Sequence, residues 1–150
     1  MTGSPIEETE MTQVTQVTLV GTDLALLEGL AQSLSALGHR ATVTSSLLEA
    51  RELALASPPL VLVADRALVA EAGAELMAVP LSSGGARLLY RTASAAMTTA
   101  LLPAVERAVL ADLTLPLERH RLTMLVQTIG ERARLTGRAL RHTPTEGRTI

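Results

Sequence analysis

Strand-like and helix-like segments alternate five times along this chain of 150 residues, which predicts an α/β fold built on one doubly wound parallel sheet. Two observations support this prediction. Residues 60–64 (LVLVA) are apolar without interruption, as in a strand that is buried on both faces of a parallel sheet. Amphipathic segments with apolar residues three and four positions apart separate the strand-like runs, and such helices would cover both faces of the sheet.

The first strand and helix are the most clearly marked. The run 16–21 (QVTLVG) is rich in β-branched residues and ends in glycine, which is typical of a short strand. Residues 24–37 place four leucines at helical spacing, and Gly38 supplies a natural end to that helix. The residues before them, 1–13, are polar and contain three glutamates, so we expect them to be disordered.

The second strand is predicted at Arg40–Thr44 (RATVT), and a helix follows at Leu47–Ala56. Two serines precede this helix and can cap its N-terminus, and two prolines after it prevent its continuation. Residues 60–64 then form the third strand, which Asp65 closes. This strand is the central one of the prediction because its apolar run has no polar face.

The boundaries between strands and helices are less clearly marked in the second half of the chain. Residues 70–79 predict a helix, and the loop 82–85 (SSGG) leads into a fourth strand at 86–90 (ARLLY). The segment 95–109 predicts a helix that begins late or bends at Pro103.

The last strand and helix close the domain. Residues 112–115 predict a short fifth strand, and 117–141 predict a long helix with one apolar stripe. Because this helix is longer than the sheet requires, its second half should extend beyond the sheet and could pair with another chain. Two glycines within it each cost about 1 kcal/mol, so it could instead fray. Residues 142–150 are predicted to be a disordered tail, which leaves 14–141 as the folded domain.

The composition excludes several classes of function. The chain has 13 arginines and no lysine, no cysteine, and a single aromatic residue, Tyr90. The lack of cysteine removes disulfides, thiol nucleophiles and most zinc sites. The near absence of aromatic side chains argues against base stacking on single-stranded nucleic acid. The polar N-terminus resembles no signal peptide, and no apolar run is long enough to span a membrane, so we expect a soluble cytoplasmic protein without membrane partners.

Charge is unevenly distributed along the sequence. Residues 1–117 carry 12 acidic and 6 arginine side chains, whereas 118–150 carry 3 acidic and 7 arginine side chains. A basic end could meet an acidic partner or a nucleic-acid backbone. A solvated arginine-rich helix face explains the same pattern, and we consider nucleic-acid binding the weaker interpretation.

Four motifs give the chain its likeness to a known family. In order they are VGTDLALLEGLAQSLSALGH, LVLVADRALVAEAGAEL, RLLYRTAS and DLTLPLERHRLTMLV. With this order and spacing, over about residues 15–130, the chain resembles the receiver domain of bacterial two-component response regulators. The resemblance implies a flavodoxin-like sheet of five parallel strands in the order 2-1-3-4-5. It also implies a site at the carboxyl ends of the strands, where such sheets bind their ligands.

By this resemblance, Asp65 takes the position of the phospho-accepting aspartate, and Thr92 that of a hydroxyl that hydrogen-bonds a phosphoryl oxygen. The two adjacent acids with which the family holds Mg²⁺ fall on Gly21 and Thr22. Neither residue carries a carboxylate. Asp23 lies one position later, so Asp23 and Asp65 are only weak candidates for binding Mg²⁺.

The basic and aromatic positions of the family's site are changed as well. The lysine that pairs with the phosphate falls on Leu115, before a retained Pro116 whose preceding peptide bond the resemblance implies to be cis. The aromatic switch residue falls on Asp112. A phosphoryl group adds nearly two negative charges, and the loss of the metal ligands and the lysine leaves little to offset them. We therefore expect no cofactor, Mg²⁺ included, and no efficient phosphorylation.

Other polar residues near the site have simpler interpretations. Arg66 directly follows Asp65 and should point away from it, and Arg91 should face opposite to Thr92 by strand alternation. An aspartate at a strand end can also act as a helix cap with no chemistry. The three histidines are far apart in sequence and in different elements, which argues against a metal site or a catalytic triad.

The sequence thus predicts an atypical receiver, or pseudo-receiver, that is not an enzyme and acts by phosphorylation-independent contact with other proteins. The contact surface would be the face of the last two helices and the strand between them, about residues 95–135, binding a protein partner or a second copy. One alternative is an atypical response regulator phosphorylated on Asp65 by a partner histidine kinase. Another is a flavodoxin-like domain that binds a small molecule at the same strand ends.

Overall fold

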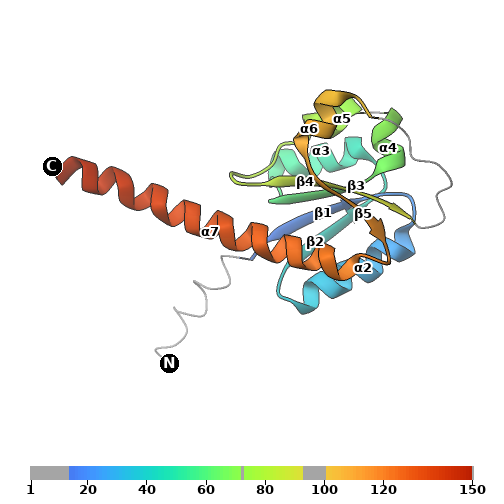
Figure 1. Cartoon of the computed structure of the whole chain (residues 1–150), viewed down its shortest axis with the longest axis horizontal. Helices are drawn as coiled ribbons and strands as arrows, with labels where there is room; N and C mark the ends of the chain where they lie inside the picture. The colour runs from blue at the N-terminus through green and yellow to red at the C-terminus, as the bar shows by residue number, and fades with distance from the viewer. Residues whose placement is uncertain (1–13, 72, 93–100, 150) are drawn as a thin grey trace.

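Five parallel strands form one sheet in the order β2-β1-β3-β4-β5 in the computed structural model of the chain (Figure 1). The structure describes residues 14–71, 73–92 and 101–149. The strands are β1 (Gln16–Val20), β2 (Arg40–Thr44), β3 (Val61–Asp65), β4 (Ala86–Thr92) and β5 (Val109–Leu115). The predicted α/β class and the strand order implied by the family resemblance are both confirmed.

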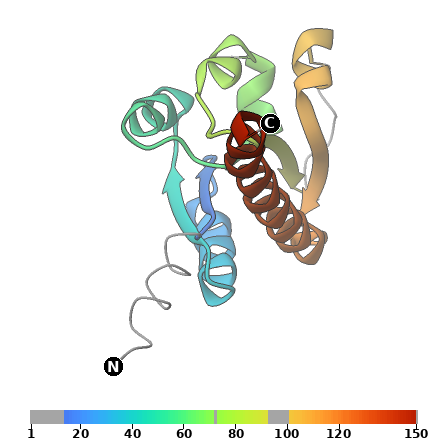
Figure 2. The ribbon, with the colours of Figure 1, turned by 90° about the vertical axis from the view of Figure 1, so that its left-hand side faces the viewer.

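Helices cover both faces of this sheet. They are α2 (Leu24–Ala36), α3 (Leu47–Ala56), α4 (Arg66–Glu71), α5 (Gly73–Ala78), α6 (Pro103–Ala108) and α7 (Arg119–Thr149). Figure 2 shows α2 and α7 on one side of the sheet, and α3, α5 and α6 on the other. Right-handed crossovers between parallel strands place helices on both sides in this way.

Local sequence signals explain where the first helices begin and end. The Asp23 side chain accepts a hydrogen bond from the Leu26 amide at 3.2 Å and so caps α2. The Ser46 hydroxyl caps α3 in the same way, through the Glu49 amide at 3.0 Å. Gly38 has a φ of +91°, a left-handed conformation that glycine adopts readily, and it turns the chain from α2 toward β2.

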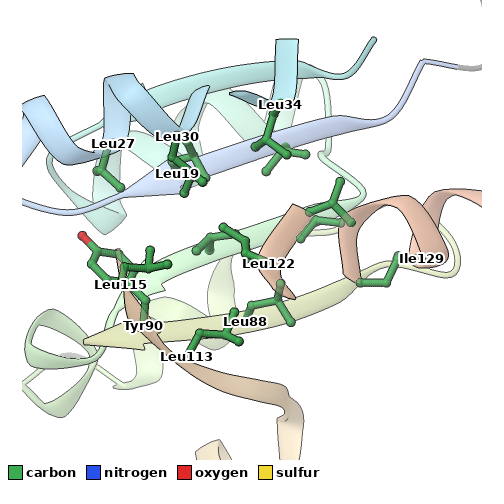
Figure 3. Close-up of a cluster of buried hydrophobic side chains, with 14 residues drawn as sticks. Leu19, Leu27, Leu30, Leu34, Leu88, Tyr90, Leu113, Leu115, Leu122 and Ile129 are labelled. Carbon is green, nitrogen blue, oxygen red and sulfur yellow. The ribbon is translucent and has the colours of Figure 1, made fainter. Parts of the chain in front are cut away.

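Alternation along the strands divides the core into two layers. One layer lies between the sheet and helices α2 and α7, and it contains Val61, Val63, Leu88, Tyr90 and Leu115 (Figure 3). The other layer lies against α3, α5 and α6 and contains the strand residues between these. Every residue of β3 before Asp65 is fully buried, as its unbroken apolar run predicts.

The bounds of several elements differ from the sequence prediction. Helix α4 begins directly after β3, where no helix was expected, so the predicted helix 70–79 corresponds to the end of α4 and the whole of α5. Strand β5 begins at Val109, three residues before its predicted start, and α6 spans only Pro103–Ala108. A short apolar run suits a buried strand as well as a helix, which explains the misassigned boundary. Part of the predicted helix 95–109 lies outside the described residues.

Helix α7 also differs from its predicted range. It begins at Arg119 and continues to Thr149, so the end predicted at residue 141 is too early and most of the expected tail is helical. This continuation contains Pro144, which has no amide hydrogen to donate and disfavours a helix interior, so helix propensity does not explain it. The helix runs back along the sheet and projects beyond it (Figure 1). In the part of the chain that the structure describes, no helix combines the length and apolar character needed to cross a membrane.

Gly130 on α7 lies close to the chain just before β1. It is buried, and a Cβ atom at this position would overlap with the hydroxyl oxygen of Thr15, just before β1. Three residues later, Ala133 lies against the loop at Gly84, where an added Cβ atom would be 3.4 Å from the Ala133 Cβ atom. The glycine that weakens the helix in isolation therefore permits a close helix–strand contact.

Candidate functional site at the carboxyl ends of the strands

The structure brings three of the predicted site positions, Asp65, Thr92 and Leu115, together with Tyr90, to the carboxyl end of the sheet and to one of its faces. Asp65 pairs in register with Tyr90, and Thr92 pairs with Leu115. Alternation places all four of these residues on the face that α2 and α7 cover. Gly21 extends the same edge, because its amide donates to the Thr44 carbonyl at 3.1 Å. The expected site geometry at the strand ends is therefore present.

Asp65 ends β3, and α4 begins at the next residue, Arg66. Its carboxylate accepts a hydrogen bond from the Ala67 amide at 2.9 Å, and the residue is half-buried. This contact satisfies one of the free amides at the start of the helix. The structure thus contains the capping role considered for this residue, while its position at the strand end is that of the family's phospho-acceptor.

The positions that would hold a metal ion do not provide the ligands that Mg²⁺ requires. Gly21 is buried and has no side chain, and Thr22 is exposed. The Asp23 carboxylate is exposed and caps α2 instead. Among the described residues, no group of three or more acidic, histidine or cysteine side chains could hold a metal ion. Because Mg²⁺ prefers several hard oxygen ligands in near-octahedral geometry, the residues present do not fit it.

Tyr90 is the functional-site residue that the sequence analysis missed. Its side chain is fully buried (Figure 3), and its hydroxyl oxygen would overlap with a Cβ atom added at Gly21. Burial raises the pKa of this hydroxyl above its ordinary value, and the charges of Asp65 and Asp23 raise it further. One signal was available: Tyr90 is the only aromatic residue and lies two positions before Thr92, on the same face of the strand.

The β5 side of the site is apolar. Leu115 is 1% exposed and packs in the core layer under α2 and α7, so the lysine position offers no charge to an anion. The peptide bond between Leu115 and Pro116 is cis, as the resemblance implied.

Asp112 and the two nearby arginines belong to the opposite face. The Arg66 guanidinium forms ion pairs with Asp112 and, at 3.4 Å, with Glu106 of α6. It therefore turns to the α6 side of the sheet, as expected of a residue pointing away from Asp65. The Nε of Arg91 donates to the Thr114 hydroxyl at 3.5 Å, on that same side. The family resemblance implies an aromatic residue at position 112, and in this chain Asp112 instead forms an ion pair with Arg66.

Comparisons with known proteins support the fold. No family model and no curated protein sequence matches the chain. Among solved structures, a response regulator receiver domain protein from Clostridium thermocellum matches with a TM-score of 0.63 and 12% identity, covering 82% of this chain and 99% of that one. A CheY-like receiver domain from Methanospirillum hungatei JF-1 matches with a TM-score of 0.63 and 16% identity, covering 79% and 95%. A third, from Methylobacillus flagellatus, has a TM-score of 0.60 and 18% identity, covering 77% and 98%.

Identities of 12–18% at nearly full coverage of the matched domains are a likeness of fold. The topology, the cis bond before Pro116 and the positions of Asp65 and Thr92 at the ends of β3 and β4 agree with that likeness. The site itself contains a glycine, a threonine and a leucine where the family resemblance implies two acids and a lysine. The chain therefore has the receiver fold of response regulators.

Proposed function

We propose that this chain is a receiver-like signalling module that acts by contact with other proteins and without phosphorylation of Asp65. The single observation that carries the proposal is the lack of charged side chains at three positions of the site at the carboxyl ends of the strands. Gly21, Thr22 and Leu115 provide no charge at the three positions where the family resemblance implies two carboxylates and an ammonium group. Without these charged groups, nothing at these three positions would bind a metal ion or balance the negative charge of a phosphoryl group on Asp65.

The physical argument compares the charge that phosphorylation adds with the charge available to balance it. A phosphoryl group brings nearly two negative charges and three strong acceptor oxygens. Catalysis of its transfer depends on positioning and on electrostatic stabilisation by metal and cationic groups. Here the Leu115 side chain is apolar and buried, and the ion pairs of Arg66 lie on the opposite face of the sheet. Phosphorylation of Asp65 would therefore be slow and weakly stabilised.

The proposed contact surface consists of α6, β5 and the first half of α7. We call it the β5 face. Large apolar side chains are exposed on these elements: Leu110 is 58% exposed on β5, and Met124 is 53% exposed on α7. Leu117, in the turn between them, is 78% exposed. Strand β5 is also the edge of the sheet, where backbone groups on the outer side have no neighbouring strand among the described residues. A protein partner or a second copy would cover these groups.

The claim that Asp65 is not phosphorylated is tested by titration with Mg²⁺ and with a phosphate mimic. Amide resonances of Gly21, Asp65 and Thr92 would be followed by NMR with Mg²⁺ up to millimolar concentration, and then with beryllofluoride. We expect no saturable shift at these residues. Intact mass after incubation with acetyl phosphate and Mg²⁺ should also show no gain. A mass gain that Asp65→Asn abolishes would overturn the proposal and support the alternative, an atypical receiver phosphorylated on Asp65.

The claim that the β5 face binds other proteins is tested by placing a charged side chain on this face. Leu110→Arg and Met124→Arg should each reduce self-association, measured by sedimentation velocity over a range of concentrations, or reduce binding to an identified partner. The matched control is Leu55→Arg on α3, where the leucine is 67% exposed on another part of the molecule. If Leu55→Arg has the same effect as the two β5-face variants, this surface is not the interface.

A further inference from the structure

The Tyr90 hydroxyl is a buried polar group without a partner. Its side chain is fully buried, and its hydroxyl oxygen makes no hydrogen bond among the described residues. Buried hydroxyl groups are almost always hydrogen-bonded, because leaving one unpaired costs stability. A plain apolar residue would fill the same core position without that penalty. The position of the hydroxyl therefore calls for an explanation.

The surroundings of the hydroxyl provide one. A Cβ atom on Gly21 would overlap with the hydroxyl oxygen and would lie 3.2 Å from the Cζ atom of the same ring. It would also lie 3.2 Å from the Cδ1 atom of Leu27 on α2. The overlap with the hydroxyl oxygen cannot be relieved without movement, and the two 3.2 Å contacts are tighter than most contacts of a real Cβ atom, so a side chain at position 21 requires Tyr90 to shift. Tyr90 and Gly21 are thus mutually dependent.

The direction of the Tyr90 side chain links its contact with Gly21 to the site at Asp65. Tyr90 belongs to β4 and Gly21 follows β1, and β3 lies between these strands in the sheet. To reach Gly21, the ring crosses β3 near its carboxyl end, where Asp65 pairs with Tyr90 in register. Figure 3 shows the hydroxyl directed toward Leu27 and α2, away from its own strand. The ring therefore fills the space between the ends of β1, β3 and β4.

We propose that Tyr90 closes the cation pocket of this fold: its phenol ring and hydroxyl occupy the space that an acidic side chain at position 21 and a metal ion beside Asp65 would otherwise share. This inference rests on the proposed function, since it explains how the site became independent of phosphorylation. A six-coordinate ion with several bound waters needs an open, oxygen-lined space, and here that space contains an aromatic ring. Tyr90 thus acts as a positioning residue that determines what the site excludes.

The first test is a double-mutant cycle in metal-free buffer, which depends on packing alone. Gly21→Ala should lower the melting temperature by several degrees in the protein with Tyr90. The same change should have a much smaller effect in a Tyr90→Leu background, where the overlapping atoms are gone. Gly29→Ala, at a helix position with open space around it, is the control and should not lower the melting temperature in either background. Equal losses from Gly21→Ala in both backgrounds would overturn the proposal.

If Gly21→Ala prevents folding altogether, the cycle remains decisive, because Tyr90→Leu must then restore a folded protein. Circular dichroism and a dispersed NMR spectrum would report that rescue. Failure of Tyr90→Leu to restore folding would mean that the Tyr90 hydroxyl is not the group that excludes a side chain at position 21.

The second test asks whether Tyr90 excludes the ion. Mg²⁺ affinity would be measured by NMR for Gly21→Asp alone and for Gly21→Asp combined with Tyr90→Leu. We expect the double variant to bind Mg²⁺ at least about tenfold more tightly, with shifts at the Asp65 amide. Equal affinity, including no binding by either variant, would overturn the role of Tyr90. Acetyl phosphate labelling of the wild type on Asp65 would instead overturn the proposed function, and it would leave the packing cycle unchanged.

Discussion

Arg66, the residue directly after Asp65, forms an ion pair with Asp112 of the edge strand β5. The Arg66 side chain is 12% exposed and that of Asp112 is 32% exposed, so the pair is partly shielded from water. Glu106 of α6 lies 3.4 Å from the same guanidinium. Helix α4 is therefore joined to α6 and to β5, which follows α6 directly in the sequence, and these ion pairs connect the strand-end site to the proposed β5 face.

A double-mutant cycle should detect this connection. Arg66→Met and Asp112→Asn should each destabilise the protein, and the coupling energy between them should be about 1 kcal/mol at low salt, near the upper end for partly exposed pairs. Urea unfolding of the four proteins measures it. Raising the salt concentration should reduce the coupling, because screening weakens ion pairs. A coupling within error of zero at low salt would mean that the two side chains do not interact in solution.

Substitutions of Asp65 should separate its structural role from a chemical one. Asp65→Asn keeps an oxygen that can accept the Ala67 amide, so we expect a change in stability of less than about 0.5 kcal/mol. Asp65→Ala removes the acceptor and should cost about 1 kcal/mol, as for the loss of a helix cap. Chemical denaturation measures both variants. Equal stability of Asp65→Ala and the wild type would show that the capping bond contributes nothing.

Gly130→Ala should destabilise the protein although alanine is the better helix former. The added methyl group would overlap with the Thr15 hydroxyl, and overpacking of this kind costs about 1–3 kcal/mol, against a gain of about 1 kcal/mol in helix propensity. Gly29→Ala on α2 has open space around it and should be stabilising by roughly 0.5–1 kcal/mol. Thermal unfolding distinguishes the two. A stabilising effect of both changes would place α7 farther from β1 than described.

The ionisation of Tyr90 predicts a loss of stability at alkaline pH. Burial raises the pKa of its hydroxyl above the ordinary value of 10.0, and the charges of Asp65 and Asp23 add to the shift. The unfolded chain loses this proton near pH 10, whereas the folded chain retains it. The contribution to stability is therefore complete below about pH 10 and is lost as the pH rises above it. Tyr90→Phe should remove this dependence, leaving only that of the other groups.

Absorbance offers a direct measurement, because Tyr90 is the only aromatic residue of the chain. The tyrosinate signal should appear together with unfolding, and not at about pH 10 in the folded protein. A simple titration curve centred at about pH 10 with the fold intact would contradict the buried position of the hydroxyl.

The fold could be predicted from the sequence because its strongest signals are local. The unbroken apolar run of β3, the leucine spacing of α2, Gly38 after α2 and the serines before α3 act over a few residues each, and they fix the element order. The boundaries that were missed lack such signals. Helix α4 has only six residues, too few for a helical repeat to be visible, and the apolar start of β5 is compatible with either structure.

The site was predicted less completely, for a physical reason. The missing acids and lysine could be read from Gly21, Thr22 and Leu115 because those positions follow from motif spacing. The contact between Tyr90 and Gly21 joins residues far apart in the sequence, across an intervening strand, and depends on the direction of one side chain. The pairing of Arg66 with Asp112 likewise depends on the order of three strands. Spacing along the chain carries no information about such contacts.

Helix α7 has a practical consequence for how this protein can be handled. The helix starts at the carboxyl end of β5, passes Thr15 before β1, and leaves the sheet at the edge where β1 and β2 begin (Figure 1). Val14 lies at that same edge. An affinity tag or a biosensor surface attached at either end of the described chain would therefore hold the molecule by one pole. The opposite pole, with Asp65, would face the solution and remain accessible to any analyte passed over it.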